Sequence, residues 1–207
     1  MRLASACVAV LVPLTLAWGQ ARPAPPLADQ AAAPNRAGWA VDARTGCWLW
    51  NAHPREGETV LWNGGCDSSG RATGPGVAEW HRAGKIDRTE GEYRDGKRNG
   101  RGVHISLDGL RYEGEFRDDK FHGRGVLTFV NGNRYEGEFG NNLFQGSGVL
   151  TFANGNRYDG EWRDGKPNGR GVYLRVDGNR FAGEWRDGCF REGRRNAAIG
   201  RPLSECR

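Results

Sequence analysis

Residues 112–134 read YEGEFRDDKFHGRGVLTFVNGNR, and residues 135–157 read YEGEFGNNLFQGSGVLTFANGNR. The same pattern continues in residues 158–180 as YDGEWRDGKPNGRGVYLRVDGNR, and less regular copies extend it to residues 89–190. The copies align without a gap at a period of 23 residues. Because a unit this short cannot enclose a core alone, each repeat is expected to stack on its neighbours.

Each repeat begins with an aromatic residue, a glycine and a second aromatic residue at alternate positions, as in Tyr112, Gly114 and Phe116. This alternation predicts a strand with one apolar and one charged face. The glycine is expected to leave room on the apolar face for a ring from the adjacent strand. The residues of this aromatic face are Tyr112, Phe116, Tyr135, Phe139, Tyr158, Trp162, Phe181 and Trp185.

The Asn131-Gly132 pair and its counterparts predict tight two-residue turns, because both central residues of such a turn need positive φ. A second strand is expected to begin at the paired glycines, such as Gly123 and Gly125. Each repeat is therefore predicted to be a β-hairpin. The predicted fold class is all-β: an elongated, single-layer, twisted antiparallel sheet of stacked hairpin repeats.

The sequence of Tyr-x-Gly-Glu-aromatic, Gly-x-Gly and Asn-Gly resembles the MORN (membrane occupation and recognition nexus) repeat family. The resemblance covers residues 89–190 and implies hairpins laid side by side in one long open sheet. Relatives by this motif include junctophilins, plant phosphatidylinositol phosphate kinases and a histone lysine methyltransferase. In those proteins the array is accessory to another domain, so the resemblance implies much less about function than about fold.

The N-terminal segment 1–21 reads as a secretory signal peptide, with a basic start, an apolar run to Trp18 and small residues that allow cleavage after Gly19 or Ala21. A transmembrane anchor is the alternative, but the run is short for a span and contains Pro13. Residues 22–37 are rich in Pro and Ala and predict an extended leader. The expected localisation is secreted or periplasmic.

Loss of the signal peptide would leave four cysteines in an oxidising compartment, which favours disulfides. Of the three connectivities, the local one closes short loops at the two ends of the array. It pairs Cys47 with Cys66 and Cys189 with Cys206. Unpaired buried thiols are the alternative, and a zinc site is poorly supported because no CxxC pair occurs and the histidines are scattered.

Residues 38–88 are expected to form a cap of degenerate hairpins, because a terminal repeat must cover an exposed edge strand. Within it, residues 47–50 and 59–62 would pair as one hairpin. The tryptophans of the cap are interpreted as packing residues. A glycan-binding platform is the alternative for Trp48, Trp50 and Trp62.

The chain has a net charge of +5, but its repeats, residues 89–190, hold 16 Lys and Arg against 16 Asp and Glu. Such a neutral surface argues against a nucleic-acid partner. The repeated acids, such as Glu115, are expected to form cross-strand ladders with arginines such as Arg111. The C-terminal tail, residues 191–207, is basic. Its candidates for contact with anionic headgroups are Arg191, Arg194, Arg195 and Arg201.

No catalytic motif stands out, because the glycines follow the hairpin period and neither G-x-S-x-G nor H-E-x-x-H occurs. The chain is expected to be a non-enzyme that needs no cofactor. An open sheet requires something to cover its apolar face. The aromatic face is therefore expected to form a groove for a protein partner or a second copy of the chain. Binding to a membrane surface is the alternative.

Overall fold

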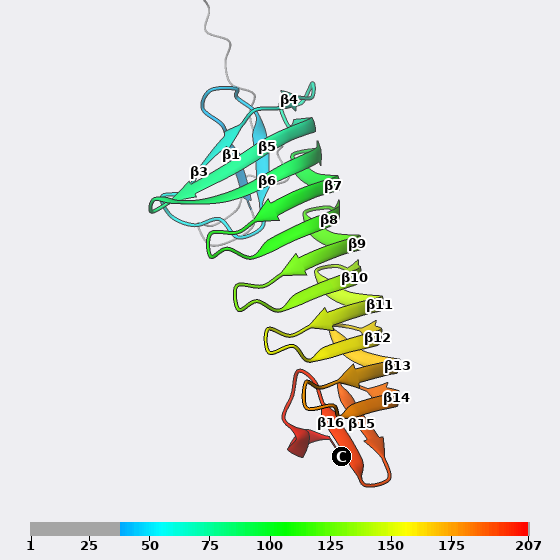
Figure 1. The fold of residues 1–207 in the computed structure, drawn as a ribbon. Helices are drawn as coiled ribbons and strands as arrows, with labels where there is room; N and C mark the ends of the chain where they lie inside the picture. The colour runs from blue at the N-terminus through cyan, green and yellow to red at the C-terminus, as the bar shows by residue number, and fades with distance from the viewer. Residues whose placement is uncertain (1–37, 207) are drawn as a thin grey trace, which may run out of the picture.

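The computed structural model describes residues 38–206, so the expected signal peptide (1–21), the leader (22–37) and Arg207 lie outside the described residues. A single open antiparallel sheet of fourteen strands dominates the described part (Figure 1). Its strands follow one another in sequence order, except the short strand Gly65–Cys66, which lies off this path. The prediction of an elongated all-β sheet of consecutive hairpins is confirmed.

Ten long strands form the body of the sheet. They are β5 (Ala72–Arg82), β6 (Lys85–Arg94), β7 (Lys97–Ile105), β8 (Arg111–Arg117), β9 (Lys120–Thr128), β10 (Arg134–Gly140), β11 (Leu143–Thr151), β12 (Arg157–Arg163), β13 (Lys166–Leu174) and β14 (Arg180–Arg186). Shorter elements flank them: β1 (Gly38–Val41), β2 (Trp48–Asn51), β3 (Thr59–Trp62), β4 (Gly65–Cys66), β15 (Cys189–Glu192), β16 (Arg195–Ala198) and the 3-10 helix Leu203–Glu205.

The two-residue turns join the strands within each repeat. Asp118 and Asp119, between β8 and β9, have φ values of 48° and 65°, and Asn141 and Asn142 repeat this geometry between β10 and β11. Both central residues thus occupy the left-handed region, as a turn of this length requires. Asp and Asn tolerate that region better than other side chains, which explains their place here.

The prediction of a two-residue turn at Asn131-Gly132 is wrong. The pair lies in the longer connection 129–133, where only Gly132 has positive φ, 85°. The Gly132 N–H donates to the Phe129 carbonyl oxygen at 2.9 Å, and the Asn133 N–H donates to the Asn131 side chain at 3.0 Å. Asn131 therefore closes the turn with its side chain and needs no left-handed backbone.

The second strand of each repeat begins earlier than predicted. β9 already begins at Lys120, and Gly123 lies inside it at a β-bulge, with a φ of 55°. The register between β8 and β9 shifts just after Gly114, and equivalent shifts occur in the hairpins β6–β7, β10–β11 and β12–β13. Bulges bend the strands that carry them and increase their twist.

A row of paired glycines crosses the ten long strands. It consists of Gly76, Gly91, Gly102, Gly114, Gly125, Gly137, Gly148, Gly160, Gly171 and Gly183. A Cβ on Gly137 would lie 2.5 Å from the Gly148 Cα and 2.7 Å from the Tyr135 hydroxyl oxygen. The ring over Gly137 thus comes from its own strand, two residues earlier, and not from the adjacent strand as predicted. The same Tyr135 ring also lies over Gly148, and for that glycine it does come from the adjacent strand.

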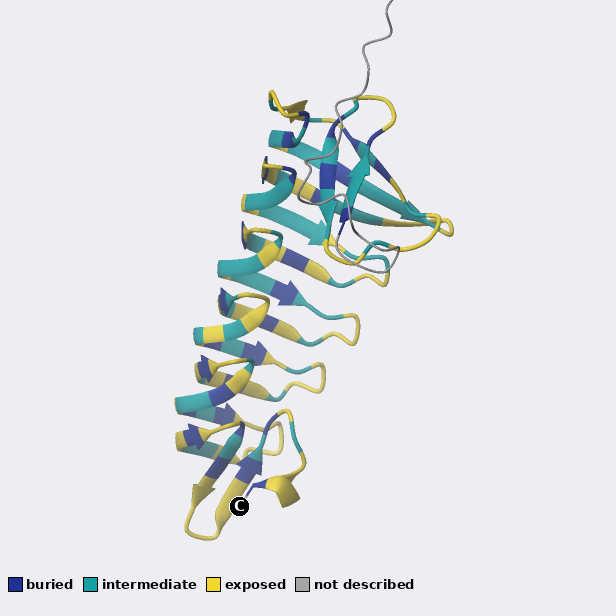
Figure 2. Cartoon of the chain, turned by 180° about the vertical axis from the view of Figure 1, so that it is seen from behind, coloured by how far each residue is buried: buried dark blue, intermediate teal, exposed yellow. Residues whose placement is uncertain are grey.

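An aromatic core runs along the inner face of the curved strands, where buried segments recur from one hairpin to the next (Figure 2). The centroid of the Tyr135 ring lies 5.1 Å from that of Phe139 and 5.3 Å from that of Trp162 in the next repeat. Tyr135 also stacks on Phe144 at 3.7 Å, and its hydroxyl donates to the Glu138 carbonyl oxygen at 3.0 Å. Each tyrosine therefore ties its own hairpin to the following one.

At the N-terminal end, β1 and β2 form a separate two-stranded sheet that lies over the first long strands (Figure 1). The hairpin predicted between residues 47–50 and 59–62 does not form, because β2 pairs with β1 and β3 pairs with β5. The Trp50 N–H donates to the Gly96 carbonyl oxygen at 2.9 Å, which fixes the small sheet to the β6–β7 turn. The molecule therefore has two layers at this end.

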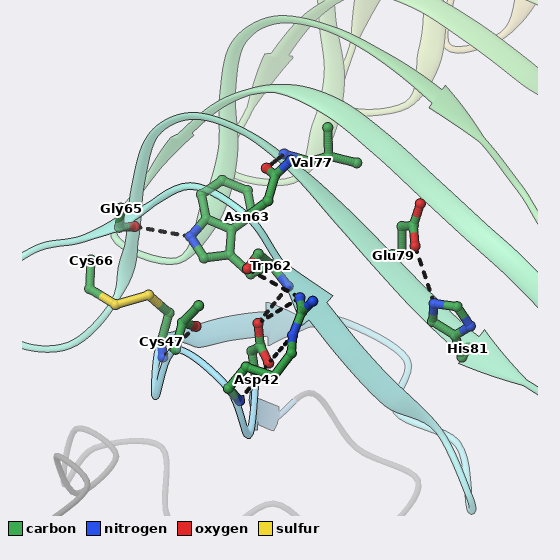
Figure 3. A network of polar contacts seen from close by, with 11 residues as sticks. Asp42, Cys47, Trp62, Asn63, Gly65, Cys66, Val77, Glu79 and His81 are labelled. Atoms are coloured by element: carbon green, nitrogen blue, oxygen red, sulfur yellow. Dashed lines mark hydrogen bonds and ion pairs between the residues drawn. A yellow bond between two sulfur atoms is a disulfide. The ribbon is translucent and has the colours of Figure 1, made fainter.

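The buried carboxylate of Asp42 holds the cap together (Figure 3). It accepts hydrogen bonds from the Trp62 N–H at 2.8 Å and from the Arg44 guanidinium at 3.2 Å. Burial alone would raise the pKa of Asp42, but the hydrogen bonds from Arg44 and Trp62 bring it below its ordinary value. The Trp62 ring covers Gly64 and Gly76 much as the tyrosines cover the later glycines.

The part of the chain that the structure describes contains no helix long and apolar enough to cross a bilayer.

Candidate functional site: a polar pocket between the cap and the array

The residues predicted to line an open aromatic groove lie in the core. Seven of the eight rings are at most 4% exposed, and only Phe181 is half-buried. The seven are Tyr112, Phe116, Tyr135, Phe139, Tyr158, Trp162 and Trp185. The physical reason is that rings of neighbouring repeats fill the space on the inner face themselves. A partner cannot contact these side chains while the array keeps this packing.

Both cysteine pairs are joined as predicted. Cys47 and Cys66 form one disulfide and Cys189 and Cys206 the other, each with a Cα–Cα distance of 5.6 Å. The first ties the start of β2 to β4 (Figure 3). The second ties β15 to the end of the described chain. One disulfide therefore cross-links the chain near the first strands of the sheet, and the other cross-links it near the last strands.

The basic tail is partly engaged within the molecule. Arg191 donates to the Cys206 carbonyl oxygen, and Arg195 forms an ion pair with Glu192 at 3.4 Å. The Arg195 guanidinium also lies over the Phe181 ring, 5.6 Å from its centroid. Arg194 is exposed, and Arg201 is half-buried. The four predicted headgroup contacts are thus not equally available.

The predicted cross-strand ladder of repeated acids and arginines does not form at Glu115, although Glu184 in the last repeat does pair across strands with Arg170 at 3.5 Å. Arg111 pairs instead with Glu113, two residues along its own strand, at 2.7 Å, and the later repeats show the same pairing. The Glu115 carboxylate lies over the bulge at Gly123 and near the Arg124 N–H, at 3.5 Å. The bulge brings this backbone N–H within reach of the glutamate, which explains the difference.

A polar pocket lies where the cap meets the array, and the sequence analysis missed it. It has a volume of about 230 Å³. Strand β2 and the loop 52–58 line one side, and β5, β6, β7 and the β8–β9 turn line the other. The lining residues are Trp50, Asn51, Ala52, His53, Arg55, Glu58, Trp80, Asp87, Thr89, Tyr93, Arg98, His104, Leu107 and Asp119.

Hydrogen bonds order the array side of this pocket. The His104 Nδ1 lies 3.0 Å from the Thr89 hydroxyl and 3.4 Å from the Asp87 carboxylate. The Arg98 guanidinium lies 3.0 Å from Asp119 Oδ1 and also donates to the Asp119 carbonyl oxygen at 2.8 Å. Asp119 Oδ2, in contrast, is buried without a hydrogen-bond partner in the described chain.

Burial shifts the titration of the pocket residues. It raises the pKa of Asp87 to about 6, although the nearby Arg98 acts in the opposite direction. It lowers the pKa of His104 to about 3, and the positive charge of Arg98 acts in the same direction. Burial also raises the pKa of Asp119 in spite of Arg98. At neutral pH His104 is therefore uncharged, and its 3.4 Å contact with Asp87 is not an ion pair.

A comparison of the repeats with one another could have indicated this pocket from the sequence. Three positions that are apolar in the core of the second repeat are polar in the first: Thr89 aligns with Tyr112, Arg98 with Phe121, and His104 with Leu127. The two repeats have the same backbone arrangement, because β6 pairs with β7 as β8 pairs with β9. Polar residues in core columns of one repeat alone indicate a local role other than packing.

Of the tryptophans considered as a glycan platform, Trp48 and Trp50 lie two residues apart on strand β2, whereas Trp62 lies in the core. Trp62 is fully buried and its ring lies against Tyr93, 4.6 Å between centroids. Trp50 lines the polar pocket, together with Trp80. Within residues 38–206 no group of His, Cys, Asp and Glu side chains is arranged to hold a metal ion.

The fold defines the class of the protein: an open β-sheet repeat protein in which each hairpin contacts mainly its neighbours. The family model of the MORN repeat matches four consecutive segments, residues 90–111, 112–134, 135–157 and 158–180. Residues 90–180 are therefore an array of four MORN repeats, as the sequence resemblance predicted. No curated protein sequence matches the chain.

Proposed function

We propose that the chain is a non-catalytic, exported scaffold that binds a protein partner through the outer face of the array. This face is opposite the aromatic core. Its central feature, which we call the outer furrow, is a line of hollows over the glycine row. The half-buried valines Val126 and Val172 line it, and Val149, also half-buried, occupies the same column of the repeat between them.

The single observation that supports this proposal is the accessibility of the furrow along the whole array while the inner face is filled. Ten strands at about 4.8 Å spacing make a surface roughly 45 Å long, which is ample for a protein interface. The acids beside the valines are already paired with arginines, as in Arg134 and Glu136 at 2.7 Å. A face of paired charges and small apolar side chains suits a protein surface better than a polyanion.

The pocket geometry supports the absence of catalysis. A catalytic histidine relay presents one ring nitrogen to an acid and the other to a nucleophile. In this pocket Nδ1 of His104 faces both the Thr89 hydroxyl and the Asp87 carboxylate. With its pKa lowered by burial to about 3, His104 is also a poor general base at neutral pH.

The two disulfides support export, because such bonds persist mainly in oxidising compartments. The exported protein is expected to begin near Gln20 or Arg22. Intact-mass measurement of the exported protein checks this expectation. A mass that still includes residues 1–21 would contradict the signal-peptide assignment.

Site-specific photo-crosslinking in the exporting cell tests the scaffold proposal. A photoreactive residue at Val126 or Val149, in the furrow, is expected to capture a partner. The same residue at Val130, which is 64% exposed on a loop, serves as the control. Val149→Lys should abolish capture without changing the unfolding midpoint. Equal capture from both surfaces, or none from the furrow, would contradict the proposal.

The same protein serves to test two alternative functions, self-association and membrane binding. Light scattering during size-exclusion chromatography detects self-association, which Val149→Lys should abolish if the second copy uses the furrow. Pelleting with anionic liposomes detects membrane binding through the tail. Salt-sensitive pelleting that is lost in Arg194→Ala, with no crosslink from the furrow, would favour the membrane function instead.

A further inference from the structure

We propose that the polar pocket between the β1–β2 sheet and strands β5–β7 binds a single neutral sugar ring. This site is separate from the outer furrow, because its residues lie on the inner side of the sheet and in the cap. The proposal does not depend on a protein partner.

The first argument is the replacement of core residues in one repeat alone. Where Tyr112 lies over Gly114 and Gly125, the first repeat has Thr89, and no aromatic ring of that column covers Gly91 or Gly102. The space that a tyrosine, a phenylalanine and a leucine fill in the second repeat is lined here by Thr89, Arg98 and His104. Buried polar groups cost stability unless they are satisfied, so a ligand-binding role accounts for their place.

The second argument is an unsatisfied carboxylate oxygen. The Asp119 side chain is 10% exposed and lines the pocket. Its Oδ1 accepts from the Arg98 backbone N–H at 2.9 Å and from the Arg98 side chain at 3.0 Å. Its Oδ2 is buried and has no partner among residues 38–206. A buried acceptor left unpaired is costly, and a hydroxyl donor on a ligand would satisfy it.

The mixture of charges in the lining argues for a neutral ligand. Asp87, Asp119 and Glu58 face the guanidinium groups of Arg55 and Arg98 in the same cavity. A full charge of either sign on a ligand would approach at least one like charge in a partly desolvated space. Sugar hydroxyls both donate and accept hydrogen bonds, so they can use carboxylates and guanidinium groups side by side.

The aromatic walls argue for a ring with an apolar face. Trp50 and Trp80 are half-buried and line the pocket, and Tyr93 lies deeper, at 5% exposed. Trp50 is held by an edge-on contact with Trp39 at 5.4 Å. The C–H face of a pyranose packs against such rings while its hydroxyls reach polar side chains. A volume of about 230 Å³ equals that of roughly eight water molecules, which suits one sugar ring and not a chain.

Calorimetric titration of the mature, disulfide-bonded protein tests the proposal. The probes are D-glucose, D-galactose and N-acetyl-D-glucosamine, with D-glucosamine and D-glucuronate as charged analogues of the same ring. We expect saturable binding of at least one neutral sugar, at least about tenfold tighter than binding of either charged analogue. Saturable binding of a charged analogue alone, or of none of the five, would overturn the proposal.

Two variants locate the site. Thr89→Tyr restores the residue of the later repeats and should abolish binding by filling the pocket. Asp119→Asn should weaken binding by at least about tenfold, because it replaces the acceptor Oδ2 with a donor. The neighbouring repeat shows that this change is compatible with the turn, since Asn142 accepts the equivalent backbone hydrogen bond from Phe121 at 2.7 Å.

The controls separate binding from folding. Asp118→Asn changes the adjacent, exposed carboxylate of the same turn and should leave sugar binding unchanged. Val149→Lys in the furrow should also leave it unchanged, so failure of the scaffold proposal and failure of this one are distinguishable. If Thr89→Tyr does not fold, the sugar affinity of Asp119→Asn alone tests the location of the site. Unchanged affinity in Asp119→Asn would overturn the assignment of the site.

Discussion

Asp119 and Asn142 occupy the same position in successive repeats and accept the same backbone hydrogen bond. Asp119 Oδ1 accepts from the Arg98 N–H at 2.9 Å, and Asn142 Oδ1 accepts from the Phe121 N–H at 2.7 Å. The second oxygen of Asp119 is buried and has no partner in the described chain. Asp119 Oδ1 also pairs with the Arg98 guanidinium at 3.0 Å. Neither this ion pair nor the backbone hydrogen bond uses the second oxygen of Asp119, which therefore points to another use.

Removal of a core ring should destabilise the array. Tyr135→Ala and Phe139→Ala are each expected to lower the free energy of unfolding by about 3–5 kcal/mol, and Leu150→Ala by about 2–5 kcal/mol, because all three side chains are buried. Denaturant unfolding measures these losses. Val130→Ala, at a residue 64% exposed, should change stability little. A stability loss below about 1 kcal/mol for Tyr135→Ala would mean that its ring is not core.

Two glycines only three residues apart should respond differently to alanine. A Cβ at Gly137 would lie 2.5 Å from the Gly148 Cα, whereas a Cβ at Gly140 would meet only the Gln145 side chain at 3.7 Å. Gly137→Ala should therefore cost about 1–3 kcal/mol or more through overpacking. Gly140→Ala is the matched control and should be neutral or slightly stabilising. Equal unfolding midpoints for both variants would contradict the close packing of the glycine row.

Both disulfides should contribute to stability. Each closes a short loop, with sequence separations of 19 and 17 residues. Replacement of either pair by serine should lower the free energy of unfolding by about 3 kcal/mol. Peptide mapping without reduction should recover both local pairs. A linkage between the two ends of the chain, or free thiols at all four positions, would refute the framework.

Asp87 should make the protein less stable as pH rises. Its pKa of about 6 in the folded state exceeds the ordinary value of 3.8, so the folded chain holds this proton more tightly than the unfolded chain. Stability is therefore lost as pH rises from about 4 to about 7, by up to about 3 kcal/mol. Asp87→Asn lacks this loss, and its stability relative to the unmodified protein should increase over that range. A constant difference between the two proteins would contradict the burial of a charged carboxylate.

His104 should have the opposite dependence. Its folded-state pKa of about 3 lies below the ordinary value of 6.5, so the unfolded chain binds this proton more readily. Stability is lost as pH falls from about 6.5 towards 3, by up to about 5 kcal/mol. His104→Leu introduces the residue of the aligned column and should gain stability relative to the unmodified protein as pH falls. His53→Leu replaces an exposed histidine of the same pocket and is the control. The stability of both variants relative to the unmodified protein is measured by denaturant unfolding as pH falls.

Several errors of the sequence analysis share one cause. The two-residue turn expected at Asn131-Gly132 lies instead at Asp118 and Asp119, because an asparagine can close a turn with its side chain as well as with a left-handed backbone. The expected pairing of residues 47–50 with 59–62 fails because each segment finds a different partner strand. Local residue preferences allow both outcomes, and only longer-range contacts choose between them.

The sequence by itself determined the repeat, the alternation of inner and outer residues, the glycine row and the family, because period and alternation are local properties of the chain. It also favoured the disulfide pairing that the structure contains. Only the tertiary structure decided that the aromatic face is filled from within, since that depends on contacts such as Tyr135 with Trp162 between repeats. It alone placed Trp50 and Asp119 around one cavity, because the docking of β2 on the β6–β7 turn joins residues far apart in the chain.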